Sequence, residues 1–192
     1  MDWLSFVLSG ATLLPWIIIP ISWVVGFSVW GRQLYVERRI TELGGKFDFD
    51  DCFDWTWQEV TLVDNELSWC LRNLVFLRSI DSLGLSSTSI RNADVKYLRW
   101  HRKSLEMLYV SDTNISNDFV RGLSRFPRLH RLNLARTRVS DECIAALATI
   151  PDLRWVDLSG TDCTVEGIDR LSQLKPTCHI VTGSIDDHFQ AE

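Results

Sequence analysis

Four histidines and five cysteines are the side chains of this 192-residue chain best suited to metal binding. The histidines are His101, His130, His179 and His188, and Cys178 directly precedes His179. A zinc site needs several such ligands at short, paired spacings. The sequence has one adjacent Cys/His pair and no Cys-x-x-Cys motif, so we expect no metal site.

Paired carboxylates are the next candidates, because two neighbouring acids can serve as general acid and base. Asp50–Asp51 and Asp186–Asp187 are such pairs, but they fall in a predicted loop and in a polar tail. Gly44–Gly45 lacks the surrounding motif of a phosphate-binding loop and is better explained as a helix stop. The sequence therefore predicts no catalytic residue, no cofactor and a protein that is not an enzyme.

A further set of side chains suits recognition rather than catalysis. Met107, Arg131 and Trp155 recur at intervals of 24 residues, and Tyr109 follows two residues after Met107. Methionine, arginine and large aromatic residues are enriched at the centres of protein interfaces. Their constant spacing predicts that they occupy equivalent positions in a repeated structural unit.

The segment from Leu105 to Pro176 contains three copies of one 24-residue pattern. The copies begin Leu105-Glu-Met-Leu-Tyr-Val, Leu129-His-Arg-Leu-Asn-Leu and Leu153-Arg-Trp-Val-Asp-Leu. Each is followed by a threonine, and these are Thr113, Thr137 and Thr161. A fixed period of this length indicates a solenoid, in which stacked repeats share a core that no single repeat can form.

The pattern Leu-x-x-Leu-x-Leu-x-x-Thr-x-[Ile/Val]-[Ser/Thr] resembles the leucine-rich repeat, which often has Asn where this chain has Thr. The resemblance implies a short strand, a turn and a helix on the convex side of each repeat. The threonines are expected to hydrogen-bond the turn backbone as the family's asparagine does. Ser116, Ser140 and Thr164 stand at positions of helix N-caps, with acidic residues after them.

Less regular copies precede these three, and Cys178-His-Ile-Val reads as a closing strand. We therefore predict about five repeats and a closing strand over residues 57–183, followed by an acidic tail over 184–192. Residues 32–56 are predicted to hold a short helix and an alternating strand that cap the first repeat.

Residues Trp3 to Gly31 contain no Asp, Glu, Lys or Arg. A membrane-spanning helix needs about 20 apolar residues, so residues 1–31 are predicted to be a single-pass transmembrane anchor, with a cleaved signal peptide as the alternative. Arg32, Arg38 and Arg39 follow and place the repeats in the cytoplasm, with the periplasmic side as the alternative. This succession is similar to that of a bacterial group of membrane-anchored leucine-rich-repeat proteins.

The predicted fold class is thus an α/β leucine-rich-repeat solenoid with an N-terminal transmembrane helix. Short parallel strands line its concave face and helices its convex face. The residues between the buried leucines of the strands are expected to point outward and to bind an unknown protein or peptide. These residues are Met107, Tyr109, Arg131, Asn133, Trp155, Asp157 and His179. Alternatively, Arg131 and Trp155 only stack on each other across neighbouring strands.

The charge of the chain is segregated, although its net value is −5. From Arg91 to Arg138 there are eleven Lys/Arg and four Asp/Glu, whereas from Asp141 to Glu192 there are three and ten. The basic segment is either a solvated surface or a docking surface for an acidic partner or anionic lipid. The sequence pI of about 5.4 argues against a nucleic-acid partner.

An odd number of cysteines at unpaired spacings favours reduced thiols. Cys163 stands where the other copies have Ile115 and Val139, so it is expected to act as a small buried hydrophobe.

The predicted function is a membrane-anchored, non-enzymatic scaffold for protein binding. Two alternatives remain open at this stage. One is a self-associating, envelope-organising homo-oligomer, and the other is a periplasmic or secreted recognition module.

Overall fold

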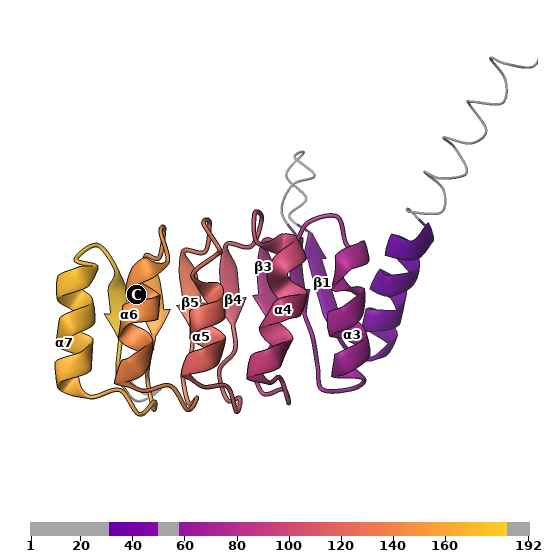
Figure 1. The fold of residues 1–192 in the computed structure, drawn as a ribbon. Helices are drawn as coiled ribbons and strands as arrows, with labels where there is room; N and C mark the ends of the chain where they lie inside the picture. Colours follow the sequence, from indigo (N-terminus) through magenta and orange to yellow (C-terminus); the bar gives the residue numbers. More distant parts are fainter. Residues whose placement is uncertain (1–30, 50–57, 184–192) are drawn as a thin grey trace, which may run out of the picture.

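The computed structural model describes residues 31–49 and 58–183, which form one seven-stranded sheet with a row of short helices on one face (Figure 1). The strands lie in chain order from β1 to β7. They are β1 (Lys46–Phe49), β2 (Gln58–Thr61), β3 (Ser82–Gly84), β4 (Met107–Tyr109), β5 (Arg131–Asn133), β6 (Trp155–Asp157) and β7 (His179–Val181). The β1–β2 pair is antiparallel and all later pairs are parallel.

Helical segments connect the parallel strands, because a parallel pair requires a crossover. The α-helices are α3 (Leu67–Asn73), α4 (Val95–Leu98), α5 (Asn117–Leu123), α6 (Ile144–Thr149) and α7 (Val165–Leu174). The 3-10 turns are η1 (Leu74–Phe76), η2 (Asn92–Asp94), η3 (Arg99–His101) and η4 (Asp141–Cys143). All of these connections lie on the same side of the sheet, so the opposite face corresponds to the predicted concave face (Figure 1).

The core lies between the sheet and this row of helices. The central residues of four strands, Leu83, Leu108, Leu132 and Val156, are at most 1% exposed. Each pairs with the next across the parallel ladder, so they form one continuous apolar row. Burying such side chains contributes about 1.5–3 kcal/mol each, and it is shared between neighbouring repeats.

The threonine of each repeat closes the turn that follows its strand. The hydroxyls of Thr88, Thr113, Thr137 and Thr161 donate to the carbonyl three residues earlier, each at 2.6 Å. The expected bond from this threonine to the turn backbone is therefore present in four successive repeats. It satisfies a carbonyl that the strand ladder leaves without a partner.

The residue before each of these threonines has a left-handed backbone. Ser87, Asp112 and Arg136 have φ values of 58°, 56° and 54°, and Gly160 has 65°. Glycine alone adopts this region without strain, yet only the last of the four turns has it. The three other residues are held there by the turn and by the neighbouring repeat, as in the bond from Asp112 N–H to Ala135 O at 2.9 Å.

A helix over residues 31–42 and strand β1 cover the first repeat. Val36 and Ile40 of this helix are 2% and 1% exposed and join the core. The chain then turns at Gly44, where φ is 96°. A Cβ on Gly45 would lie 2.5 Å from Ile40 Cγ2 and 2.9 Å from Thr61 O, so only glycine fits where the helix meets the sheet.

The predicted fold class needs a correction, which concerns the single-pass transmembrane helix. Within residues 31–49 and 58–183, every helix falls short of the length and apolar character needed to cross a membrane. These helices are short and bury one face against the sheet; α7, for example, has ten residues, against about 20 in a membrane span. Over the described residues, the supported class is a mixed α/β fold with a seven-stranded sheet, in which no helix is long and apolar enough to span a membrane.

Residues 1–30, on which the predicted anchor falls, and the tail 184–192 lie outside the described residues. The placement of the repeats on the cytoplasmic side of a membrane stays a prediction from the flanking arginines.

Candidate protein-binding face

The parallel register brings the predicted binding residues into two adjacent rows. Met107 pairs with Arg131, Arg131 with Trp155 and Trp155 with His179. The second row is Tyr109, Asn133 and Asp157. Because neighbouring strands lie about 4.8 Å apart, these side chains form one surface across β4 to β7, which we call the open face. The helices lie on the other side of the sheet (Figure 1).

Arg131 and Trp155 are in direct contact at the centre of the first row. The guanidinium carbon of Arg131 lies 5.0 Å from the centroid of the indole ring. Arg131 is exposed and Trp155 is half-buried. The stacking that we considered as an alternative is therefore present, and a cation–π pair at an exposed site contributes about 0.5–1 kcal/mol.

Met107 and Tyr109 form the aromatic and thioether part of the open face. The Tyr109 hydroxyl donates to Met107 Sδ at 3.6 Å, and both side chains are half-buried. Their neighbours on β3 are Ser82 and Gly84. The large side chains of β4 therefore stand beside two small residues of β3, both of which are buried.

The side chains of Asn133 and Asp157 each accept a hydrogen bond from the backbone two residues later. Asn133 Oδ1 accepts from Ala135 N–H at 2.9 Å, and Asp157 Oδ1 accepts from Ser159 N–H at 2.9 Å. Asp157 is only 5% exposed. These are turns closed by the side chain of an Asx residue onto the N–H two residues later. The strand alternation that predicted both residues to point outward does not account for this local bond.

His179 lies at the end of the first row, beside Trp155 on β7. It is exposed, whereas His101 is buried and its Nε2 lies 2.8 Å from Leu74 O. Burial lowers the pKa of His101. That residue is therefore a neutral core histidine with a satisfied ring nitrogen.

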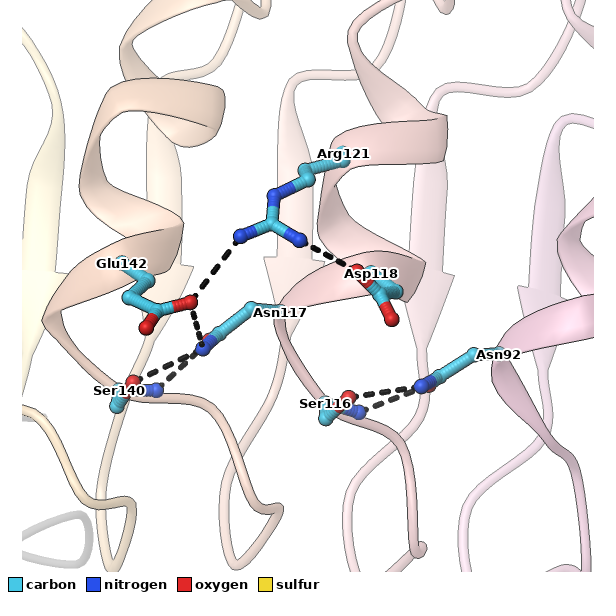
Figure 2. A network of polar contacts seen from close by, with 7 residues as sticks. All are labelled: Asn92, Ser116, Asn117, Asp118, Arg121, Ser140 and Glu142. Atoms are coloured by element: carbon cyan, nitrogen blue, oxygen red, sulfur yellow. Dashed lines mark hydrogen bonds and ion pairs between the residues drawn. The ribbon is translucent and has the colours of Figure 1, made fainter.

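A second set of polar contacts, on the helix side, was not predicted from the sequence (Figure 2). Asn92 Nδ2 donates to Ser116 Oγ at 2.7 Å, and Ser116 N–H donates to Asn92 Oδ1 at 2.9 Å. Asn117 makes the same two bonds to Ser140, each at 2.9 Å. Each asparagine thus holds the serine that precedes the helical segment of the next repeat.

Asp141 continues this series with Thr164. Its carboxylate accepts from Thr164 N–H at 2.8 Å and from the Thr164 hydroxyl at 2.7 Å. These bonds lower the pKa of Asp141. A Cβ on Gly167 would lie 2.2 Å from Asp141 Oδ1, so the glycine leaves room for the carboxylate.

The predicted N-caps are thus only partly caps. Thr164 Oγ1 accepts from Gly167 N–H at 3.1 Å and caps α7. Ser116 and Ser140 occupy the N-cap positions without a side-chain bond to their own helices. Their hydroxyls are engaged by the preceding repeat instead. The available signal was Asn92, Asn117 and Asp141 recurring with the repeat period.

Two thiols on the helix side also interact. Cys143 is buried and Cys163 is half-buried. The hydrogen bond with Cys143 lowers the pKa of Cys163 to about 7. The same bond and burial raise the pKa of Cys143. Cys163 is therefore less completely buried, and more acidic, than the small core hydrophobe predicted at its position.

No protein-family model matches this sequence, and no curated protein matches it. Among solved structures, a leucine-rich-repeat protein of Leptospira interrogans is similar, with 16% sequence identity and a TM-score of 0.43. The match covers 62% of this chain and 34% of the other protein, so the chain spans about a third of its length. The resemblance to membrane-anchored bacterial proteins stays a prediction.

The parallel sheet, with one helical connection per strand, fits a leucine-rich-repeat-like fold.

Proposed function

We propose that this protein is a non-enzymatic scaffold that binds a protein or a peptide through its open face. The observation that carries the proposal is the row of Met107, Arg131 and Trp155 on three adjacent strands. Tyr109 extends this row on one side. Tryptophan, tyrosine and arginine dominate the residues that contribute most to protein binding.

The geometry supports this proposal because the central side chains are held before a partner arrives. The Arg131 guanidinium carbon lies 5.0 Å from the Trp155 ring centroid, and the Tyr109 hydroxyl donates to Met107 Sδ at 3.6 Å. Side chains that are already ordered lose less conformational entropy on binding. We expect a partner to place an apolar side chain against Trp155 or Tyr109 and an acidic group near Arg131.

The test is partner capture by crosslinking with the full chain and with Trp155→Ala/Tyr109→Ala. We expect crosslinked partners to be lost in the double variant, whose far-ultraviolet circular dichroism stays that of the wild type. Val165→Ala/Leu174→Ala is the matched control, since both of its side chains are exposed on α7, away from the open face. Unchanged crosslinking in the Trp155→Ala/Tyr109→Ala variant would show that the open face is not the binding site.

Self-association is a distinct outcome of the same experiment. If the crosslinked product is a second copy of this chain, the protein is a homo-oligomer, and sedimentation velocity would show its size.

A further inference from the structure

The edge at which the helices end and the strands begin carries exposed aromatic and basic side chains. It is the upper edge in Figure 1. Trp100 on η3 is 58% exposed, and Phe76 on η1 is 37% exposed. Arg99, Arg102 and Lys103 are exposed beside Trp100. We call these five residues the basic–aromatic edge.

Hydrogen bonds between repeats hold the two parts of this edge together. His101 on η3 reaches Leu74 O on η1 at 2.8 Å. The hydroxyl of Ser104, directly after Lys103, donates to Ile80 O at 2.9 Å. The edge is therefore a fixed part of the fold and not a set of unrelated loops.

The cations of the edge are available to a partner. From Lys96 to Lys103 the sequence has four Lys/Arg and no Asp/Glu. Within the part of the chain that the structure describes, Arg99, Arg102 and Lys103 form no ion pair. The guanidinium of Arg99 instead lies over Trp100, 4.8 Å from the ring centroid.

These side chains surround a shallow, open depression. Arg99, Trp100, Arg102 and Lys103 line a volume of about 330 Å³. Three cations and one indole around an open depression suit a phosphate group with apolar atoms attached to it. The depression is lined by no acidic residue that would repel such a group.

The start of the helix over residues 31–42 lies at this same edge (Figure 1). Its Arg32 lies over the ring of Phe76, with the guanidinium carbon 5.5 Å from the centroid. Leu34, two residues further, is 63% exposed, and Tyr35 is 62% exposed with its ring edge-on to Trp69 of α3, 6.3 Å between centroids. Apolar, aromatic and basic side chains therefore continue along one edge from the first described helix to η3.

We propose that the basic–aromatic edge binds the surface of an anionic phospholipid bilayer. Tryptophan and tyrosine favour the interface between membrane and water, because their rings are apolar and their N–H or O–H group is polar. Lysine and arginine close to an anionic leaflet are attracted to its headgroups. An edge that combines both types, on consecutive repeats, can lie flat on a bilayer while the open face stays accessible.

A nucleic acid or an acidic protein would also be attracted by the cations, but neither accounts for the exposed apolar side chains as well. A nucleic acid can stack its bases on Phe76 and Trp100, but the exposed aliphatic side chain of Leu34 offers it neither a stacking surface nor a polar group. The proposal depends neither on the open face nor on the structure of residues 1–30.

Hydrogen exchange of the full chain tests this proposal, with phosphatidylcholine vesicles that either contain or lack phosphatidylglycerol. We expect amides of residues 75–78 and 99–104 to gain protection only with the anionic vesicles. This protection should disappear at about 1 M salt, where the Debye length is about 3 Å. Exchange is the readout because it locates the contact even if another segment of the chain also associates with lipid.

The variant Arg99→Glu/Arg102→Glu/Lys103→Glu should lose this protection. Removing three cations should weaken the binding to anionic vesicles about a hundredfold, and charge reversal should weaken it further. The matched control is Lys46→Glu/Arg138→Glu/Arg170→Glu, which changes the net charge equally at exposed positions outside the edge. It should keep the protection, and Trp100→Ala should reduce it without any change in charge.

Three results would overturn the proposal. One is equal protection with both kinds of vesicle, and another is protection that survives charge reversal. The third is stronger protection by a single-stranded oligonucleotide or by polyglutamate at the same concentration of charge, which would assign the edge to that class of partner instead.

Discussion

Asn117 of one repeat holds Ser140 of the next by two hydrogen bonds, each at 2.9 Å. Figure 2 shows this pair beside the equivalent pair of Asn92 and Ser116. Since the two residues of each pair belong to successive repeats, the bonds contribute to the stacking of repeats and not to one helix alone. Arg121, which bonds Glu142 at 3.1 Å and also pairs with Asp118, links the same two repeats from outside.

The first prediction is that Asn117→Ala destabilises the fold. It leaves Ser140 N–H without its partner, at a cost of about 1–3 kcal/mol in the free energy of unfolding. Urea unfolding measures this change. Asn114→Ala is the control, because Asn114 is exposed in a nearby turn of the same repeat. Equal midpoints for the two variants would show that the pair does not stabilise the stacking.

The second prediction concerns the buried threonines. Thr137→Val keeps the shape of the side chain but removes the hydroxyl that donates to Leu134 O at 2.6 Å. We expect a loss of about 1–2 kcal/mol, because that carbonyl then stays unsatisfied in a buried turn. Thermal unfolding provides the measurement. Thr137→Ser retains the hydroxyl and should lose less; a ranking in the opposite order would mean that the methyl group matters more than the bond.

The third prediction follows from the left-handed turn residues. Gly160→Ala should lower the free energy of unfolding by about 1–2 kcal/mol, since φ is 65° at this position. The added Cβ would also lie 3.1 Å from Arg136 Cγ. Gly31→Ala is the matched substitution, with no atom within 4 Å of its Cβ. It should be neutral in urea unfolding, and similar losses at both sites would contradict the turn argument.

The fourth prediction is a dependence of stability on pH through Asp141. Its pKa is lowered by the bonds from the hydroxyl and N–H of Thr164. A carboxylate of this kind stabilises the fold above its unfolded pKa of about 3.9. This contribution is lost as the pH falls through the lower folded value.

Asp141→Asn isolates this effect, because asparagine occupies the equivalent positions 92 and 117, where its Oδ1 accepts from the backbone N–H and its Nδ2 donates to the hydroxyl. We expect the variant to match the wild type near pH 7 and to lose less stability in acid. Urea midpoints between neutral pH and pH values below about 3.9 provide the comparison. Parallel curves for the two proteins would assign the acid sensitivity to other carboxylates.

The fifth prediction is selective reactivity of Cys163. Its pKa is lowered to about 7 by the hydrogen bond with Cys143, whereas burial raises the pKa of Cys178. Only the thiolate is nucleophilic, so iodoacetamide should alkylate Cys163 faster than Cys178 at neutral pH. Cys143→Ala removes the donor and should slow this reaction, as followed by mass spectrometry. An unchanged rate in Cys143→Ala would show that the thiol pair does not set the reactivity.

The sequence by itself determined the strands, the order of the repeats and the rows of the open face. The reason is that a solenoid stacks its repeats in chain order, so residues 24 positions apart, such as Met107 and Arg131, become neighbours. It also determined the role of the threonines, because each bonds a carbonyl only three residues away.

Only the tertiary structure decided how polar side chains are shared between repeats. Its position predicted that Ser116 caps its own helix. Instead, Ser116 forms two hydrogen bonds with Asn92 of the preceding repeat. Asp157 was expected to face outward as an exposed residue, whereas it is 5% exposed and its carboxylate accepts from Ser159 N–H. The partner that a polar side chain bonds is the group that lies closest once the repeats are stacked. Helix and strand propensities do not predict which group that is.

The basic–aromatic edge was also formed by the tertiary structure. Phe76 and Trp100 are 24 residues apart and belong to successive repeats, but the sequence alone did not show that both rings stay exposed. They lie at one edge because η1 and η3 both end their crossovers there, joined by the contact of His101 with Leu74 O at 2.8 Å. The sequence showed that the segment is basic, whereas the packing of the crossovers determined that its cations and its exposed rings lie together.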